Sequence, residues 1–65
     1  MIETIIRKFL SSGYMVQIFP HPNGFSAMAV KFGTQGAHYS SVSLDESIIE
    51  LHKGMKEHDK SLEIE

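Results

Sequence analysis

The sequence predicts a small α+β domain with the order helix, strand, strand, strand, helix, in which both helices pack on one face of a three-stranded antiparallel sheet. Two observations carry this prediction. Apolar residues recur at helical spacing near both ends of the chain. Between them lie segments of β-branched and aromatic residues, separated by turns that contain glycine or proline. With 65 residues, we expect one compact domain over residues 1–58 and a loose tail over residues 59–65.

The first helix is predicted from about residue 2 to residue 12. Its apolar residues fall at i, i+3, i+4, i+7 and i+8, the pattern of an amphipathic helix. They are Ile2, Ile5, Ile6, Phe9 and Leu10. Gly13 follows directly, and glycine readily takes the left-handed conformation that ends a helix.

Three strands are predicted over residues 14–19, 25–32 and 37–42. Residues 20–24 contain Pro20, Pro22 and an Asn23-Gly24 pair, so we expect a loop between the first two strands. Residues 33–36 begin and end with glycine and predict the second turn.

The second helix is predicted to begin after Ser43. The run Ser43-Leu44-Asp45-Glu46 fits a capping box, in which the serine side chain accepts from the Glu46 amide and the Glu46 carboxylate accepts from the Ser43 amide. Apolar residues then recur with steps of four, three and four. They are Leu44, Ile48, Leu51 and Met55.

Polar residues within the strands indicate which face of the sheet each side chain occupies, because successive side chains point to opposite faces. Gln17 assigns Tyr14, Val16 and Ile18 to the core, and Lys31 assigns Met28, Val30 and Phe32 to it. In the third strand, Ser40 and Val42 are assigned inward. The uncovered face is then unusually apolar, and we interpret it as a partner-binding surface. Its predicted residues are Met15, Phe19, Phe25, Ala27, Ala29 and Tyr39.

Two alternatives explain the same pattern without an interface. One strand could have the opposite alternation, because a shift of one residue exchanges the two faces. The tail, which contains Leu62 and Ile64, could also fold over the face.

The residues give no catalytic, cofactor or metal signature. The histidines at positions 21, 38, 52 and 58 form no His-x-x-x-His pair, so we interpret them as polar surface residues, with His21 and His38 as a weaker metal hypothesis. None of the serines lies in a Gly-x-Ser-x-Gly motif, and the chain has no cysteine. We therefore expect no enzyme activity, no cofactor and no metal site.

The element order is similar to that of the double-stranded RNA-binding domain, and Pro20-His21 stands where that family has an RNA-contacting loop. The resemblance implies RNA binding, but the second helix of that family opens with lysines, whereas Leu44-Asp45-Glu46-Ser47 stands here. The three strands with the second helix also resemble the antitoxin domain of HicB-type systems, which implies a regulator. The net charge of −2 disfavours a polyanionic partner.

These observations predict a non-enzymatic protein-interaction module that forms a homodimer, or binds and inhibits a partner protein, through the apolar sheet face. The alternative is nucleic-acid binding, with bases stacked on Phe19, Phe25 and Tyr39 and phosphates held by basic residues such as Arg7, Lys8 and Lys31. The sequence shows no secretory signal and no apolar run of about 18 residues, so we expect a cytoplasmic protein.

Overall fold

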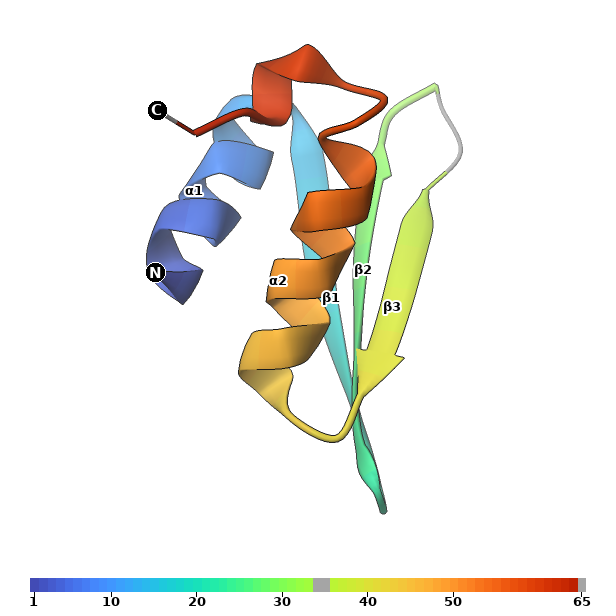
Figure 1. Cartoon of the computed structure of the whole chain (residues 1–65). Helices are drawn as coiled ribbons and strands as arrows, with labels where there is room; N and C mark the ends of the chain where they lie inside the picture. Colours follow the sequence, from blue (N-terminus) through green and yellow to red (C-terminus); the bar gives the residue numbers. More distant parts are fainter. Residues whose placement is uncertain (34–35, 65) are drawn as a thin grey trace.

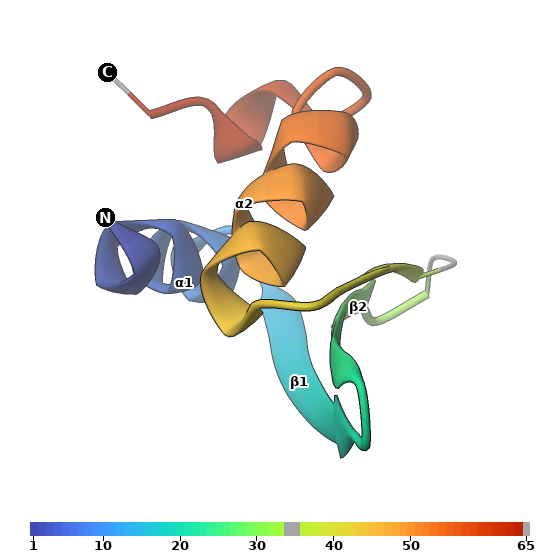
Figure 2. The same cartoon turned by 60° about the horizontal axis from the view of Figure 1, so that its bottom comes forward.

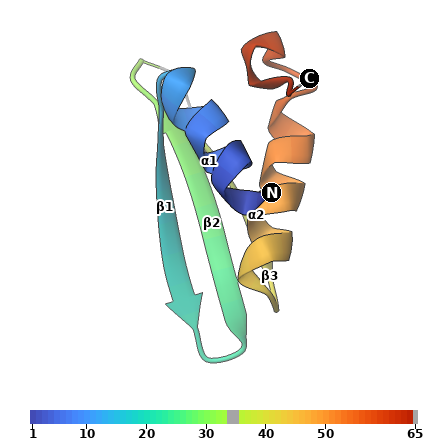
Figure 3. The ribbon, with the colours of Figure 1, turned by 90° about the vertical axis from the view of Figure 1, so that its left-hand side faces the viewer.

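The predicted fold class is confirmed by the computed structural model, which describes residues 1–33 and 36–64. The elements are α1 (Ile2–Ser11), β1 (Tyr14–His21), β2 (Gly24–Lys31), β3 (Ala37–Ser41), α2 (Leu44–Met55) and a short 3₁₀ turn, η1 (Lys60–Leu62). The antiparallel sheet has the strand order β1-β2-β3. Both helices lie on one side of it, α1 over β1 and α2 over β2 and β3 (Figures 1 and 3).

Helix α1 ends at Ser11, one residue before the predicted end, and Gly13 follows it as predicted. Gly13 has a φ of 94°, in the left-handed region that favours glycine. Ile5 and Phe9 are buried in the core, whereas Leu10 of the same apolar stripe remains exposed. The stripe is therefore wider than the surface that the sheet and α2 cover.

The loop between the first two strands is shorter than predicted. Pro20 and His21 belong to β1, Gly24 belongs to β2, and only residues 22 and 23 form the turn. Neither Asn23 nor Gly24 has a positive φ. Gly24 is needed for space instead, because a Cβ there would lie 2.2 Å from the Ser41 carbonyl oxygen. In the second predicted turn, residues 34 and 35 lie outside the described part of the chain.

Helix α2 begins at the predicted cap, and half of the capping box is present. The Ser43 side chain accepts from the Glu46 amide over 2.9 Å. The Glu46 carboxylate accepts from the Ser41 hydroxyl, over 2.5 Å, and not from the Ser43 amide. Glu46 therefore ties the first turn of α2 to the end of β3.

The core lies between the sheet and the two helices. Its buried apolar residues come from α1, β2, α2 and η1: Ile5, Phe9, Ala27, Ala29, Ile48, Leu51 and Leu62. The two alanines of β2 are fully buried because their small side chains let α2 approach the strand closely. Ser47 of α2 is also buried, and its hydroxyl donates to the Phe25 and Ser43 carbonyl oxygens over 3.0 Å each.

The segment after α2 is part of the core, which differs from the loose tail expected over residues 59–65. Leu62 is fully buried, and its carbonyl oxygen accepts from His52 Nε2 over 2.7 Å. The Ser12 hydroxyl donates to the Ser61 carbonyl oxygen over 3.1 Å. A short apolar segment with only Leu62 and Ile64 gives little periodic signal, and for that reason its packing was missed.

Candidate interaction surface

The side of the sheet opposite the helices is not covered by any described element (Figures 2 and 3). Residues paired across strands have their side chains on the same face, so the register assigns every position. We call this side the open face. Its residues are Met15, Gln17, Phe19 and His21 of β1, Ser26, Met28 and Val30 of β2, and His38 and Ser40 of β3.

The predicted partner-binding residues divide between the two faces. Met15 and Phe19 lie on the open face and are 60% and 44% exposed. The other four face the helices: Phe25, Ala27, Ala29 and Tyr39. Met28 and Val30, predicted in the core, take their place on the open face, and Ser40 is there too. The prediction was right for β1 and reversed for β2 and β3.

Lys31 explains why the alternation of β2 was misread. A lysine in a strand suggests a solvent-facing position, yet Lys31 pairs with Tyr14 on the side of the helices. Its ammonium nitrogen lies 5.4 Å from the centre of the Tyr14 ring, a cation-π contact at the end of the sheet. The long aliphatic stem reaches the rim of the core while the charged end stays at its edge. The preceding positions on that face, Ala29 and Ala27, are the buried ones.

Two further residues predicted in the core are exposed because they follow the ends of strands. Phe32 comes directly after β2 and is fully exposed, and Val42 comes directly after β3 and is 80% exposed. Ile18 does lie on the side of the helices, but the β1–β2 hairpin projects beyond them (Figure 1), so it is only partly covered.

The open face carries no charged residue. The charged residues in the described part of the chain lie on α1, at Lys31 on the other face of the sheet, and from α2 onward. The solvent-exposed face of an antiparallel sheet normally consists of polar and charged residues. Here the polar groups of that face are two histidines, two serines and one glutamine, which are interspersed with Met15, Phe19, Met28 and Val30.

The serines and His21 form a hydrogen-bonded row across the three strands. His21 Nε2 lies 2.7 Å from the Ser26 hydroxyl, which lies 2.6 Å from the Ser40 hydroxyl. A histidine beside a serine is the first part of a nucleophilic site, but such a site also needs a group that orients the imidazole. The row has no carboxylate and lies exposed on a sheet. It satisfies polar groups within the face and gives no support to catalysis.

A metal site at His21 and His38 has no support either. The two residues stand on opposite sides of β2 and four rungs apart, since they pair with Gly24 and Met28 respectively. Four residues of a strand span about 13 Å, too far for one ion. Among the described residues no three side chains of the metal-binding types form a group. His52, expected at the surface, is buried and donates to Leu62.

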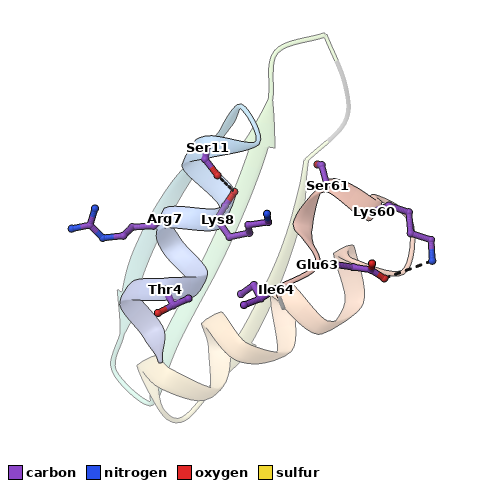
Figure 4. A pocket seen from close by; sticks show the side chains of 8 residues that line it. All are labelled: Thr4, Arg7, Lys8, Ser11, Lys60, Ser61, Glu63 and Ile64. Atoms are coloured by element: carbon purple, nitrogen blue, oxygen red, sulfur yellow. Dashed lines mark hydrogen bonds and ion pairs between the residues drawn. The ribbon is translucent and has the colours of Figure 1, made fainter.

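The helical side of the molecule contains a groove of about 700 Å³ between α1 and the last residues. Figure 4 shows the eight side chains that line it: Thr4, Arg7, Lys8, Ser11, Lys60, Ser61, Glu63 and Ile64. Arg7 points away from the groove and pairs with Glu3 over 2.8 Å, and Lys60 lies 3.7 Å from Glu63. Two of its three cations therefore lie beside carboxylates of their own elements, whereas Lys8 points into the groove without such a pair among the described residues.

A second groove, of about 430 Å³, separates α1 from α2 and is more apolar. Ile5, Ile49 and Ile64 line it, with Lys53 and Lys56 at its edge. Ile64 borders both grooves, so the segment that follows η1 separates them.

Tyr14 and Asp59 hold that segment to the sheet. The Tyr14 hydroxyl donates to Asp59 Oδ2 over 2.7 Å, and the Ser61 amide and hydroxyl donate to Oδ1. The hydrogen bond to a carboxylate raises the pKa of Tyr14 to about 12. The donors from Tyr14 and Ser61, with a contribution from the charge of Lys31, lower the pKa of Asp59 to about 2.

Comparisons with protein-family models, curated proteins and solved structures gave no match. Within the part of the chain that the structure describes, no helix has the length and apolar character needed to cross a membrane.

Proposed function

We propose that the chain is a non-enzymatic protein-interaction module that holds a partner protein on its open face and works in the cytoplasm. The observation that carries this proposal is the absence of charge from a face that displays Met15, Phe19, Met28 and Val30. Exposed apolar patches bordered by polar residues are typical of protein interaction sites, and interface centres are depleted in charge.

The size of the face agrees with this role. Two strands of eight residues and one of five, with about 3.3 Å per residue and about 4.8 Å between strands, give roughly 26 by 14 Å. This area, about 370 Å², is that of a typical functional patch on a small protein. It is smaller than the ~800 Å² per partner of a standard interface, so we expect a weak, transient complex from one face alone.

Nucleic-acid binding is disfavoured by the same geometry. A phosphate backbone is held mainly by lysine and arginine, and the open face has neither. Phe25 and Tyr39, the other two aromatic residues of that hypothesis, face the helices, so Phe19 alone remains on the open face for stacking. Arg7 and Lys8 lie on α1, on the opposite side of the sheet.

The test uses a matched pair of surface variants. Phe19→Glu places a charge on the open face in β1, and Lys60→Glu is a control on the helical side, where Lys60 is exposed. The native chain, immobilised in an extract of cells that express it, should retain a partner, which is then purified. We expect a dissociation constant at least tenfold higher for Phe19→Glu and unchanged for Lys60→Glu.

The opposite ranking would contradict the proposal and move the site to the grooves beside α1. A labelled single-stranded oligonucleotide, titrated at low salt, separates the nucleic-acid alternative. Binding that weakens steeply with salt would replace the proposed protein partner with a nucleic acid.

A further inference from the structure

The sheet has two free edges, and they differ. β1 and β3 are the outer strands, and no described strand pairs with their outer sides. β1 has eight residues against five in β3, and it contains no charged residue. Edge strands of monomeric proteins are normally protected by lysine, by a bulge or by a covering segment, because an exposed edge pairs with other strands.

The β1–β2 hairpin determines which backbone groups of β1 point outward. Its two-residue turn closes on the pair His21 and Gly24, and in such a hairpin the closing pair is hydrogen-bonded. Every second residue back from His21 therefore directs its backbone groups to β2. The residues between them direct theirs to the free edge, namely Tyr14, Val16, Ile18 and Pro20. Proline has no N–H to donate. Because the backbone groups of Pro20 point to the free edge, this lack removes no hydrogen bond between β1 and β2.

Three outward residues form a self-complementary set. If β1 meets a second β1 in antiparallel orientation about Val16, Tyr14 of each copy pairs with Ile18 of the other, and Val16 pairs with Val16. Each pair then exchanges two backbone hydrogen bonds. Pro20 falls outside this short ladder, so its missing donor does not interrupt it. No charged side chain of β1 opposes another.

Helix α1 presents an apolar strip beside the same edge. Ile2, Ile6 and Leu10 recur every four residues, and none of them lines the two grooves on the side of α2 and the last residues. Ile2 and Ile6 are partly buried against the core, and Leu10 is exposed. Helix α1 lies over β1, at the β1 edge of the sheet, as Figure 3 shows. Leu10 is 56% exposed and Ile18 is 38% exposed.

From this placement we infer that the chain forms a two-fold dimer by pairing β1 edge to edge with β1 of a second copy, with the two α1 helices packed beside the new ladder. The charged residues next to the strip are Glu3 and Arg7, already joined over 2.8 Å. An antiparallel helix pair brings Glu3 of one copy toward Arg7 of the other, so like charges do not oppose the contact.

The dimer would also complete the surface used in the proposed function, although it does not depend on that function. A continuous six-stranded sheet joins two open faces side by side and doubles the area to about 740 Å², close to the ~800 Å² per partner of a standard interface. A partner that binds across both copies would gain affinity from the doubled contact.

The experiment is light scattering with size-exclusion chromatography on the native full chain and on two matched variants. Leu10→Glu lies at the proposed contact, and Phe19→Glu lies on the open face; both replace an exposed apolar side chain with a carboxylate. We expect twice the chain mass of 7.3 kDa for the native protein and for Phe19→Glu. Leu10→Glu should have the mass of one chain, with an unchanged circular dichroism spectrum.

Amide hydrogen exchange identifies the strand involved. In the native dimer the outward amides of Val16 and Ile18 should exchange at least tenfold more slowly than in Leu10→Glu. A native monomer at millimolar concentration would overturn the inference, and so would a dimer that Phe19→Glu dissociates and Leu10→Glu does not. If partner binding still depends on Phe19 in a monomeric chain, the dimer fails and the proposed function stands.

Discussion

Met28 and Ala29 are neighbours in β2 whose side chains lie on opposite faces of the sheet, and the two faces have opposite roles. Ala29 is fully buried beneath the helices, next to the charged rim that Lys31 forms. Met28 lies on the open face, which has four apolar residues but no helix above it and no charged residue. Burial of the covered face against the helices stabilises the fold, whereas the side chains of the open face are not part of the core. An apolar surface that the core does not need is the part to examine for function.

The sharpest way to break this comparison is to place the same charge on each side. Ala29→Glu buries a carboxylate without a partner and should cost more than about 4 kcal/mol, a large part of the stability of a domain of this size. Met28→Glu leaves its carboxylate in water and should cost less than about 1 kcal/mol. Chemical denaturation followed by circular dichroism measures both, and similar losses would show that the faces are assigned wrongly.

Leu62 tests whether the last residues belong to the covered side. Its side chain is fully buried against the core, so Leu62→Ala should lower the free energy of unfolding by about 2–5 kcal/mol. Ile64→Ala, at a residue that is 42% exposed, is the matched control and should cost less. A loose tail would make the two variants equal and harmless in urea denaturation.

Gly24 tests how closely the first residue of β2 packs against the end of β3. Gly24→Ala would place a Cβ 2.2 Å from the Ser41 carbonyl oxygen, so the strands must separate locally. We expect a loss of about 1–3 kcal/mol. Gly54→Ala is the control, because nothing lies within 4 Å of a Cβ there, and alanine favours a helix by about 1 kcal/mol. Thermal melts that show equal shifts in the same direction would contradict this packing.

The smallest effect concerns the Tyr14–Asp59 hydrogen bond, and it depends on pH at both ends of the range. The pKa of Asp59 is lowered from 3.8 to about 2, so its contribution is present above pH 4 and is lost as the pH falls from about 4 to 2. The pKa of Tyr14 is raised from 10.0 to about 12, so its contribution is present below pH 10 and is lost as the pH rises toward 12. Tyr14→Phe should remove the loss of melting temperature at alkaline pH and reduce the loss at acid pH, because the Ser61 donors to Asp59 remain. Identical pH profiles for the two proteins would show that the bond contributes nothing.

The order of elements, the cap at Ser43 and the helix end at Gly13 were predictable because each rests on local sequence. The faces of β2 were not. A lysine at the end of a strand can reach the edge of a core through its aliphatic stem, as Lys31 does over Tyr14, and it then gives a misleading indication of the alternation. Gln17, in the middle of β1, indicates the alternation of that strand correctly.

Alanine and serine also conceal their roles in the sequence. The alternation from Lys31 predicts Ala27 and Ala29 on the uncovered face, whereas their small side chains let α2 pack against them. Which neighbour approaches is decided by the tertiary register. Ser47 and His52 are buried, and each donates to a backbone carbonyl oxygen of another segment, Phe25 and Leu62 respectively. The spacing of residues in the sequence does not predict such contacts.

The methionines provide the most direct test of the open face as the interaction surface. Met15 and Met28 lie on it, whereas Met1 and Met55 lie on the side of the helices. In the methyl NMR spectrum of the chain labelled at methionine, addition of the purified partner should shift or broaden the signals of Met15 and Met28. The signals of Met1 and Met55 should stay in place. Changes confined to Met1 and Met55 would contradict the account and assign the interaction to the helices.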